Sequence, residues 1–483
     1  MTNDAARRRF LALGARTLAG AGLALGADPV LALGRAEGAA GPLSGAGAGV
    51  APGPILADGA ADYRALVCVF LQGGMDGFSL LVPTGGAEYG AYARSRGSLA
   101  LDEGRLTSLA TADGTAAGVG LHRAAAPLAP LFAEGRVGFV ANVGNLVEPT
   151  SREAYESGTA RLPAQLFSHA DQEVQWQQLQ GRNRARNGWG ALAAGYLGAG
   201  QPRPWMTSVT LAGANAWQAA GGVRPFAVRD SGIVGYPGLG AGNDWERPRV
   251  EAFEAVIDQP RRHVFAQAYA DLQRRARDNT AELGRILVAR FGEEGMDVDP
   301  VPHDPATEKL AAQLNMVAKM IAVHGELGMR RQVFYVRMGG FDVHDNQNSE
   351  QPELFAALTG ALERFQQAID GFGLSNAVTT FSASDFGRTL TANGDGTDHG
   401  WGNHLFVMGG AVAGGRVHGT LPLLDVDGPD SVQNGRVLPT LSASQYAATL
   451  LRWVGLDEPG IDRVLPNLAN FGAARDLGFM RAA

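Results

Sequence analysis

The 483-residue sequence has a single cysteine, no long uninterrupted apolar run and no excess of basic charge. Cys68 cannot form a disulfide within the chain, and its place in the apolar run 65–71 predicts a buried, inert thiol. A permanent membrane span needs roughly 20 apolar residues. The best candidate, residues 11–27, is rich in glycine and interrupted by Arg16. The net charge of −7 argues against a basic track for nucleic acid.

The N-terminus carries a run of three arginines, Arg7 to Arg9, followed by Phe10 and Leu11. This pattern predicts a twin-arginine signal peptide over residues 1–36, with small residues near position 36 for cleavage. A basic helix of the mature protein is the alternative. Residues 37–62 are rich in Gly, Ala and Pro and predict a flexible leader. We therefore expect export of the folded chain by the twin-arginine translocase, to the periplasm or the extracellular space.

Residues 63–483 are expected to form one α/β domain, with a loop-rich insertion near 200–245. The continuous apolar run 64–71 is typical of a central parallel strand that is buried on both faces. Further strands are predicted at 137–143, 332–337 and 377–382, and helices at 124–134, 168–180, 307–327, 351–372 and between Ser442 and Gly455. This alternation predicts a mainly parallel sheet sandwiched between helices.

Carboxylates and histidines follow the predicted strands at four places, where open parallel sheets bind their ligands. These candidate metal ligands are Asp76, Asp342, His344, Asp385, Asp398, His399 and His404. Carboxylate oxygens and neutral imidazole nitrogens are suitable ligands for a divalent metal, and such a cluster is suited to metal-assisted hydrolysis. The alternative for each motif is an ordinary turn in which Asp or His caps the backbone.

Three further residues are candidate catalytic groups. Ser168 and His169 stand at the start of a predicted helix, where the helix dipole would stabilise a nucleophile or a bound anion. Ser168 is also a good N-cap residue, which is the alternative interpretation. Arg388 presents a planar fork suited to a tetrahedral oxyanion, and a salt-bridged arginine is the alternative.

Several short motifs, in a fixed order, resemble the domain of unknown function 1501 family from about residue 64 onward. They are Gly73–Phe78, Phe167–His169, Phe341–His344, Ser384–Thr389 and Gly396–Gly400. The resemblance implies a branch of the alkaline phosphatase and sulfatase superfamily, with an alkaline phosphatase-like fold and up to two divalent metals: zinc, calcium, magnesium or manganese. It also implies that Ser168 is the nucleophile, that Asp76, Asp385 and His399 are metal ligands, and that Asp342 with His344 forms a second metal pair.

Two positions depart from the pattern that the resemblance implies. Phe386 stands where the superfamily commonly has a histidine, and Phe167 stands where the family usually has an arginine. One metal site is therefore incomplete, absent or completed by His404 or His169. The loss of the arginine removes a cation that would hold a phosphate or sulfate.

These observations predict a metal-dependent hydrolase of phosphate or sulfate esters, acting on a small-molecule or polymeric ester. One alternative is a non-catalytic binding or assembly protein on the same scaffold. The other is a phosphoryl transferase or mutase that uses the same metals.

Overall fold

The computed structural model describes residues 62–111, 116–181, 187–221, 224–232, 247–292 and 298–481. All the described residues belong to one compact unit of the chain. The predicted signal peptide, and the predicted leader up to residue 61, lie outside the described residues. No helix in the described ranges has the length and apolar character that crossing a membrane requires.

The main sheet has nine strands within the described part of the chain, in the order β13-β5-β12-β9-β1-β8-β6-β7, with β16 also paired to β5. The strands are β1 (Arg64–Leu71), β5 (Val137–Gly144), β6 (Ser208–Thr210), β7 (Phe226–Ala227), β8 (Arg331–Met338), β9 (Val378–Ser384), β12 (Asn403–Met408), β13 (Val417–His418) and β16 (Leu441–Ser442). Strand β12 runs antiparallel to β5 and β9, and the other pairs are parallel. The prediction of a mainly parallel sheet is confirmed.

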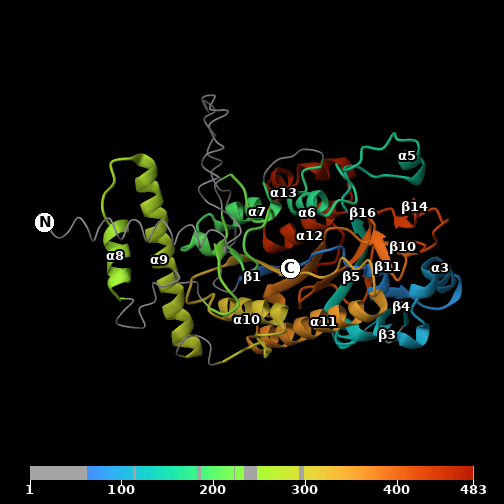
Figure 1. The fold of residues 1–483 in the computed structure, drawn as a ribbon, viewed down its shortest axis with the longest axis horizontal. Helices are drawn as coiled ribbons and strands as arrows, with labels where there is room; N and C mark the ends of the chain where they lie inside the picture. Colours follow the sequence, from blue (N-terminus) through green and yellow to red (C-terminus); the bar gives the residue numbers. More distant parts are fainter. Residues whose placement is uncertain are drawn as a thin grey trace. The chain divides into compact units, whose positions relative to one another are not determined.

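Strand β1 lies between β8 and β9 and is buried on both faces, as its apolar run predicts. Alternate side chains enter two different cores: Val67 and Val69 lie in one, and Leu66 and Cys68 in the other. Helices therefore cover both faces of the sheet (Figure 1). One core includes α4 (Leu128–Ala133), α9 (Val264–Phe291), α10 (Lys309–Ala322) and α11 (Gln347–Gly371), and the other includes α6 (His169–Gln178), α7 (Trp189–Gly198), α12 (Ala443–Val454) and α13 (Glu458–Val464).

The remaining elements are short or peripheral. Small antiparallel sheets are formed by β2 (Leu81–Pro83), β4 (Ala116–His122) and β3 (Leu106–Ala110), by β10 (Arg388–Asn393) with β11 (Gly396–His399), and by β14 (Ser431–Val432) with β15 (Arg436–Val437). The other α-helices are α2 (Gly77–Leu80), α3 (Gly86–Arg96), α5 (Arg152–Glu156) and α8 (Arg247–Ile257). The 3-10 turns are η1 (Gly97–Leu99), η2 (Glu103–Arg105), η3 (Arg123–Ala125), η4 (Pro204–Met206), η6 (Ser375–Ala377) and η7 (Pro466–Phe471).

The predicted elements differ from the structure mainly at their ends. The helix predicted over 124–134 is the turn η3 followed by α4. Helix α10 ends at Ala322, so His324 lies beyond the helix, with its ring stacked 4.0 Å from that of Tyr63. The capping box of Ser442 and Gln445 is confirmed, as is the end of α12 at Gly455, whose φ is 111°.

Candidate metal centre

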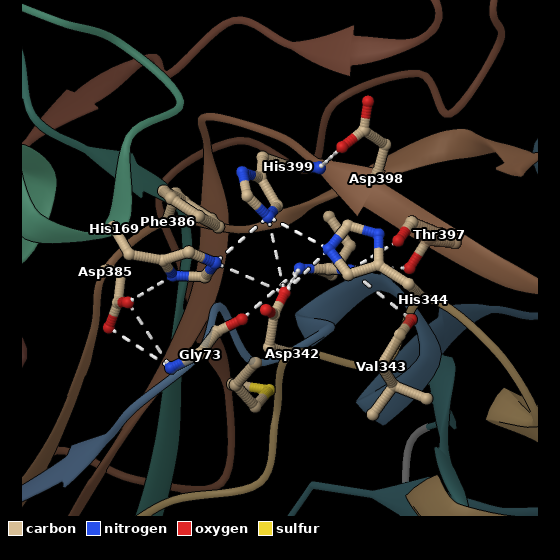
Figure 2. Close-up of polar contacts among 12 residues, drawn as sticks. Gly73, His169, Asp342, Val343, His344, Asp385, Phe386, Thr397, Asp398 and His399 are labelled. Carbon is tan, nitrogen blue, oxygen red and sulfur yellow. Dashed lines mark hydrogen bonds and ion pairs between the residues drawn. The ribbon is translucent and has the colours of Figure 1, made fainter.

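Three histidines and one aspartate converge where the carboxyl ends of the central strands meet the start of α6 (Figure 2). Asp342 and His344 follow β8, His399 ends β11, and His169 is the first residue of α6. The segments approach closely because position 396 is glycine: a Cβ there would lie 2.2 Å from the carbonyl carbon of His344. The expectation that strand ends gather these residues holds for this group.

The Nε2 atom of each histidine lies within 3.3 Å of Asp342 Oδ1. His399 Nε2 is 3.0 Å from both His169 Nε2 and His344 Nε2. Asp342 Oδ1 is 2.9 Å from His344 Nε2, 3.2 Å from His169 Nε2 and 3.3 Å from His399 Nε2. The side chain of Asp342 is 44% exposed, so the cluster is open to solvent.

The other nitrogen of two of these rings is already engaged. His399 Nδ1 donates to the carbonyl oxygen of Phe167 at 2.7 Å, and His169 Nδ1 donates to Asp385 Oδ2 at 2.8 Å. A carbonyl or carboxylate oxygen only accepts, so each neutral ring carries its hydrogen on Nδ1 and a lone pair on Nε2. Two imidazole lone pairs and a carboxylate oxygen therefore face one another, an arrangement that only added protons or a cation stabilises.

The donor set fits a divalent metal. Ligand atoms about 2.0–2.1 Å from a tetrahedral zinc lie roughly 3.3 Å apart, close to the 3.0–3.3 Å observed among His169, His399 and Asp342. Metal-bound histidines usually donate their second ring N–H to a carboxylate or a carbonyl, as both rings do here.

Hydrogen bonds, burial and neighbouring charges shift the pKa values of the cluster residues in opposite directions. The hydrogen bond to Asp385 raises the pKa of His169, while burial lowers that of His399. Burial alone would raise the pKa of Asp342, but the hydrogen bond from Arg388 and the charge of His169 outweigh it, so this pKa is lowered. Asp342 is therefore held as a carboxylate, the form that ligates metals.

A strained residue fixes the orientation of His399. Phe167 has a φ of 73°, which is uncommon for a residue other than glycine, and this conformation presents its carbonyl to His399 Nδ1. The Arg436 guanidinium lies 4.2 Å from the centre of the Phe167 ring, and its Nε donates to the His399 carbonyl at 2.9 Å. Sequence reasoning missed both roles, since a backbone acceptor leaves no signature in residue type.

Phe386, the residue that replaces an expected histidine, also contacts the centre. Its ring lies 4.8 Å from both the His169 and His399 rings. It therefore provides an apolar wall to the cluster in place of a ligand.

Asp76, predicted as a metal ligand, lies in a different environment. It is 2% exposed and caps α2, where Oδ1 accepts from the backbone N–H groups of Phe78 and Ser79 and from Arg96 at 2.6 Å. Its Oδ2 accepts from Ser79 Oγ and Gln347 Nε2, each at 2.8 Å. Burial would raise the pKa of Asp76, but the charge and the hydrogen bond of Arg96 outweigh burial, so the pKa is lowered. Asp76 is therefore a buried, paired carboxylate with no free oxygen.

His404 is likewise separate from the cluster. It is 1% exposed, its Nδ1 accepts from the backbone N–H of Asn142 at 3.2 Å, and Phe78 packs edge-on against its ring. Burial lowers its pKa to about 4, so the ring is neutral at physiological pH. The structure thus places both residues outside the cluster. Asp76 lies in a buried ion pair at the N-terminus of α2, and His404 is a buried ring beside Phe78.

Asp385 and Arg388 support the cluster from behind. Asp385 contacts the inner nitrogen of His169 instead of the point where the ligating atoms meet. Arg388 is 1% exposed and donates to Asp342 Oδ1 at 2.8 Å, to Thr397 Oγ1 and to backbone carbonyls. The salt-bridge alternative therefore describes Arg388, and its guanidinium is occupied by the protein itself.

Ser168 occupies the N-cap position of α6 without making a capping bond. Its hydroxyl instead donates to Asp171 Oδ2 at 2.8 Å. The Asp171 carboxylate therefore accepts the hydrogen of the Ser168 hydroxyl.

Two groups of possible ligands occur among the described residues, and both include His399. One joins it to His169 and Asp342, the other to His344 and Asp398. Since His399 Nδ1 is taken by Phe167, only Nε2 is available to either group. The two groups therefore describe one centre, not two independent sites.

Fold and site together define a mixed α/β protein with a histidine-rich cluster at the carboxyl ends of its central strands. The chain belongs to the family described as "Protein of unknown function (DUF1501)", which it matches over residues 63–458. A search of curated proteins found no match.

Solved structures give only distant likeness. The structure titled "Crystal structure of Ps i-CgsB" is 9% identical, with 85% of this chain and 77% of that chain covered and a TM-score of 0.34. A structure whose title concerns metabolism of glycosaminoglycans by Bacteroides thetaiotaomicron is 17% identical, with 38% of this chain and 41% of that chain covered and a TM-score of 0.23.

Proposed function

We propose that the chain is a metal-dependent hydrolase of phosphate or sulfate esters, with its reaction centre at His169, Asp342, His344 and His399. The observation that carries the proposal is the convergence of three Nε2 atoms on Asp342 Oδ1, with two of the rings fixed so that their lone pairs point inward. The ester class rests on the order of the sequence motifs, which also supports an alkaline phosphatase-like scaffold.

The ligand set favours zinc or a similar transition metal over calcium or magnesium, because three imidazoles are poor ligands for hard cations. When bound, the metal would supply Lewis-acid polarisation of an ester oxygen and activation of the attacking group. Exposure of Asp342 leaves the centre accessible to the ester.

The protein's own groups would divide the remaining work. Ser168 is the proposed nucleophile, because it directly precedes His169 at the N-terminus of α6. Asp171 would accept the hydroxyl proton, since Ser168 Oγ already donates to it. Asp385 would keep His169 in the tautomer that ligates.

The test is hydrolysis of aryl phosphate and aryl sulfate esters by the zinc-reconstituted protein. We expect one ester class to be hydrolysed, and His399→Ala to lose both activity and bound zinc. His404→Gln, which changes a buried histidine outside the cluster, should retain both. A folded, zinc-loaded protein that hydrolyses neither class would contradict the proposal.

One observation favours a non-catalytic binding or assembly protein as the second candidate. Arg388, the expected oxyanion ligand, is buried and saturated by protein acceptors. If this candidate is right, Ser168→Ala leaves the cellular phenotype unchanged, whereas loss of the phenotype in the folded variant favours the enzyme.

A further inference from the structure

A cavity of about 380 Å³ lies beside the start of α11, between the turns η2 and η3. The residues that line it include Arg105, His122, Arg123, Gln347 and Gln351. None of the metal-centre residues lines it, so it is a separate site.

The cavity wall carries two positive charges, those of Arg105 and Arg123. Arg105 and Arg123 are exposed, and neither forms an ion pair with any residue in the described ranges. The lining contains no aspartate or glutamate. Unpaired arginines gathered in a concave site provide charge-assisted donors for an oxyanion.

Two almost fully buried side chains add unpaired donors. Gln351 is 6% exposed; its Oε1 accepts from Gln347 Nε2 at 3.1 Å, and its own NH₂ has no partner among the described residues. His122 is 8% exposed, and its Nδ1 accepts from the backbone N–H of Ala124 at 3.0 Å. The neutral His122 ring therefore carries its hydrogen on Nε2, which also lacks a described partner.

The start of α11 contributes to the same side of the cavity. This 25-residue helix begins at Gln347, and its first turns line the wall through Gln347, Asn348 and Gln351. Its N-cap residue, Asn346, makes no side-chain capping bond. The positive end of the helix dipole therefore reinforces the two arginines.

We propose that this cavity binds an oxyanion, a sulfate, phosphate or carboxylate group, between Arg105 and Arg123, with Gln351 and His122 as neutral donors. Leu99, Leu101 and Pro352 form an apolar part of the wall, which suits an anionic group carried on a larger organic ligand. The site does not depend on the proposed hydrolase activity.

Gln347 lines the cavity and also begins a chain of hydrogen bonds that leads to the metal centre. Its Nε2 donates to Asp76, and its Oε1 accepts from Thr397 Oγ1 at 2.8 Å. Thr397 Oγ1 in turn accepts from Arg388, which holds the metal-centre carboxylate Asp342. An anion in the cavity is therefore three side chains away from Asp342.

The test is isothermal titration of the full chain with inorganic sulfate, inorganic phosphate and acetate, each at constant ionic strength. We expect at least one to bind, and Arg105→Gln and Arg123→Gln each to weaken it by about tenfold or more, as expected for loss of a charge-assisted hydrogen bond. Gln351→Leu should also weaken binding. If sulfate and phosphate bind more tightly than acetate, the natural ligand carries a tetrahedral anion. If acetate binds more tightly, the ligand carries a carboxylate.

Two controls keep the result specific. Arg463→Gln makes the same charge change on α13, at an exposed arginine that does not line the cavity, and should leave binding unchanged. His399→Ala should also retain binding, whether or not the protein is a hydrolase. The proposal would be overturned if none of the three anions bound, or if the Arg105 and Arg123 variants bound the anion as tightly as the wild type. Loss of anion binding in His399→Ala would also overturn it.

Discussion

Replacing Asp385 by asparagine separates a ring-orienting role for this carboxylate from a role as a direct metal ligand. Asp385 is fully buried, accepts from His169 Nδ1 at 2.8 Å and accepts from the Gly73 backbone N–H at 3.3 Å through both oxygens. Asparagine retains the size but offers only one acceptor. It therefore weakens the hold on His169 without removing a ligating atom.

The expected loss follows from that position. Replacing a group that orients a metal-bound histidine typically costs 10–100-fold in metal affinity, which is about 1.4–2.8 kcal/mol. Asp385→Asn keeps one hydrogen bond to His169, so its loss of metal affinity should be about 10-fold. The loss in Asp385→Ala should be about 100-fold. Asp342→Ala removes a proposed ligand and should cost more than either.

Competition with a chromogenic zinc chelator measures these affinities directly. Asp395→Asn is a matched control, since it makes the same substitution at an exposed aspartate near β11. An affinity of Asp385→Asn within twofold of the wild type would refute the orienting role. A loss as large as that of Asp342→Ala would instead show that Asp385 ligates the metal.

Three other substitutions have definite expected outcomes. Ser168→Ala should lower kcat for the ester by at least about 1,000-fold with zinc content unchanged, as for loss of a nucleophile; an unaltered kcat would rule out attack by Ser168. Arg96→Met should reduce the free energy of unfolding in urea by about 3–5 kcal/mol, because it strands the buried Asp76 carboxylate, and a loss below about 1 kcal/mol would contradict the buried pair. His404 has its pKa lowered from 6.5 to about 4, so the stability it contributes as a neutral ring is present above pH 6.5 and lost as the pH falls toward 4, by up to about 3 kcal/mol. In His404→Gln, whose amide oxygen can still accept from Asn142, the fall in unfolding free energy between pH 7 and pH 4 should be smaller by that amount, and an equal fall in both proteins would contradict the assignment.

The central strands were predictable because a strand buried on both faces is a continuous apolar run. Strand β1 shows this over Arg64–Leu71. Helix α9 was not predicted, because its core contacts are concentrated near its end, at Leu283, Leu287 and Phe291, while its first turns expose Val264 and Phe265.

The site was predictable as a set of strand-end residues, but the role of each was not. Asp76 and Asp342 both follow a strand and lie within two residues of a glycine. They differ in the partner that the fold brings to each: Arg96 for Asp76, and three histidines for Asp342. The carbonyl of Phe167 depends on a backbone conformation with φ of 73°. Neither feature follows from local residue type.

Elemental analysis of the purified full chain tests the central claim most directly. The account predicts one transition metal per chain in protein purified with zinc available, retained in Asp76→Asn and lost in His169→Ala and His399→Ala. Folded wild-type protein without bound metal after zinc reconstitution, or metal content unchanged in both histidine variants, would contradict it.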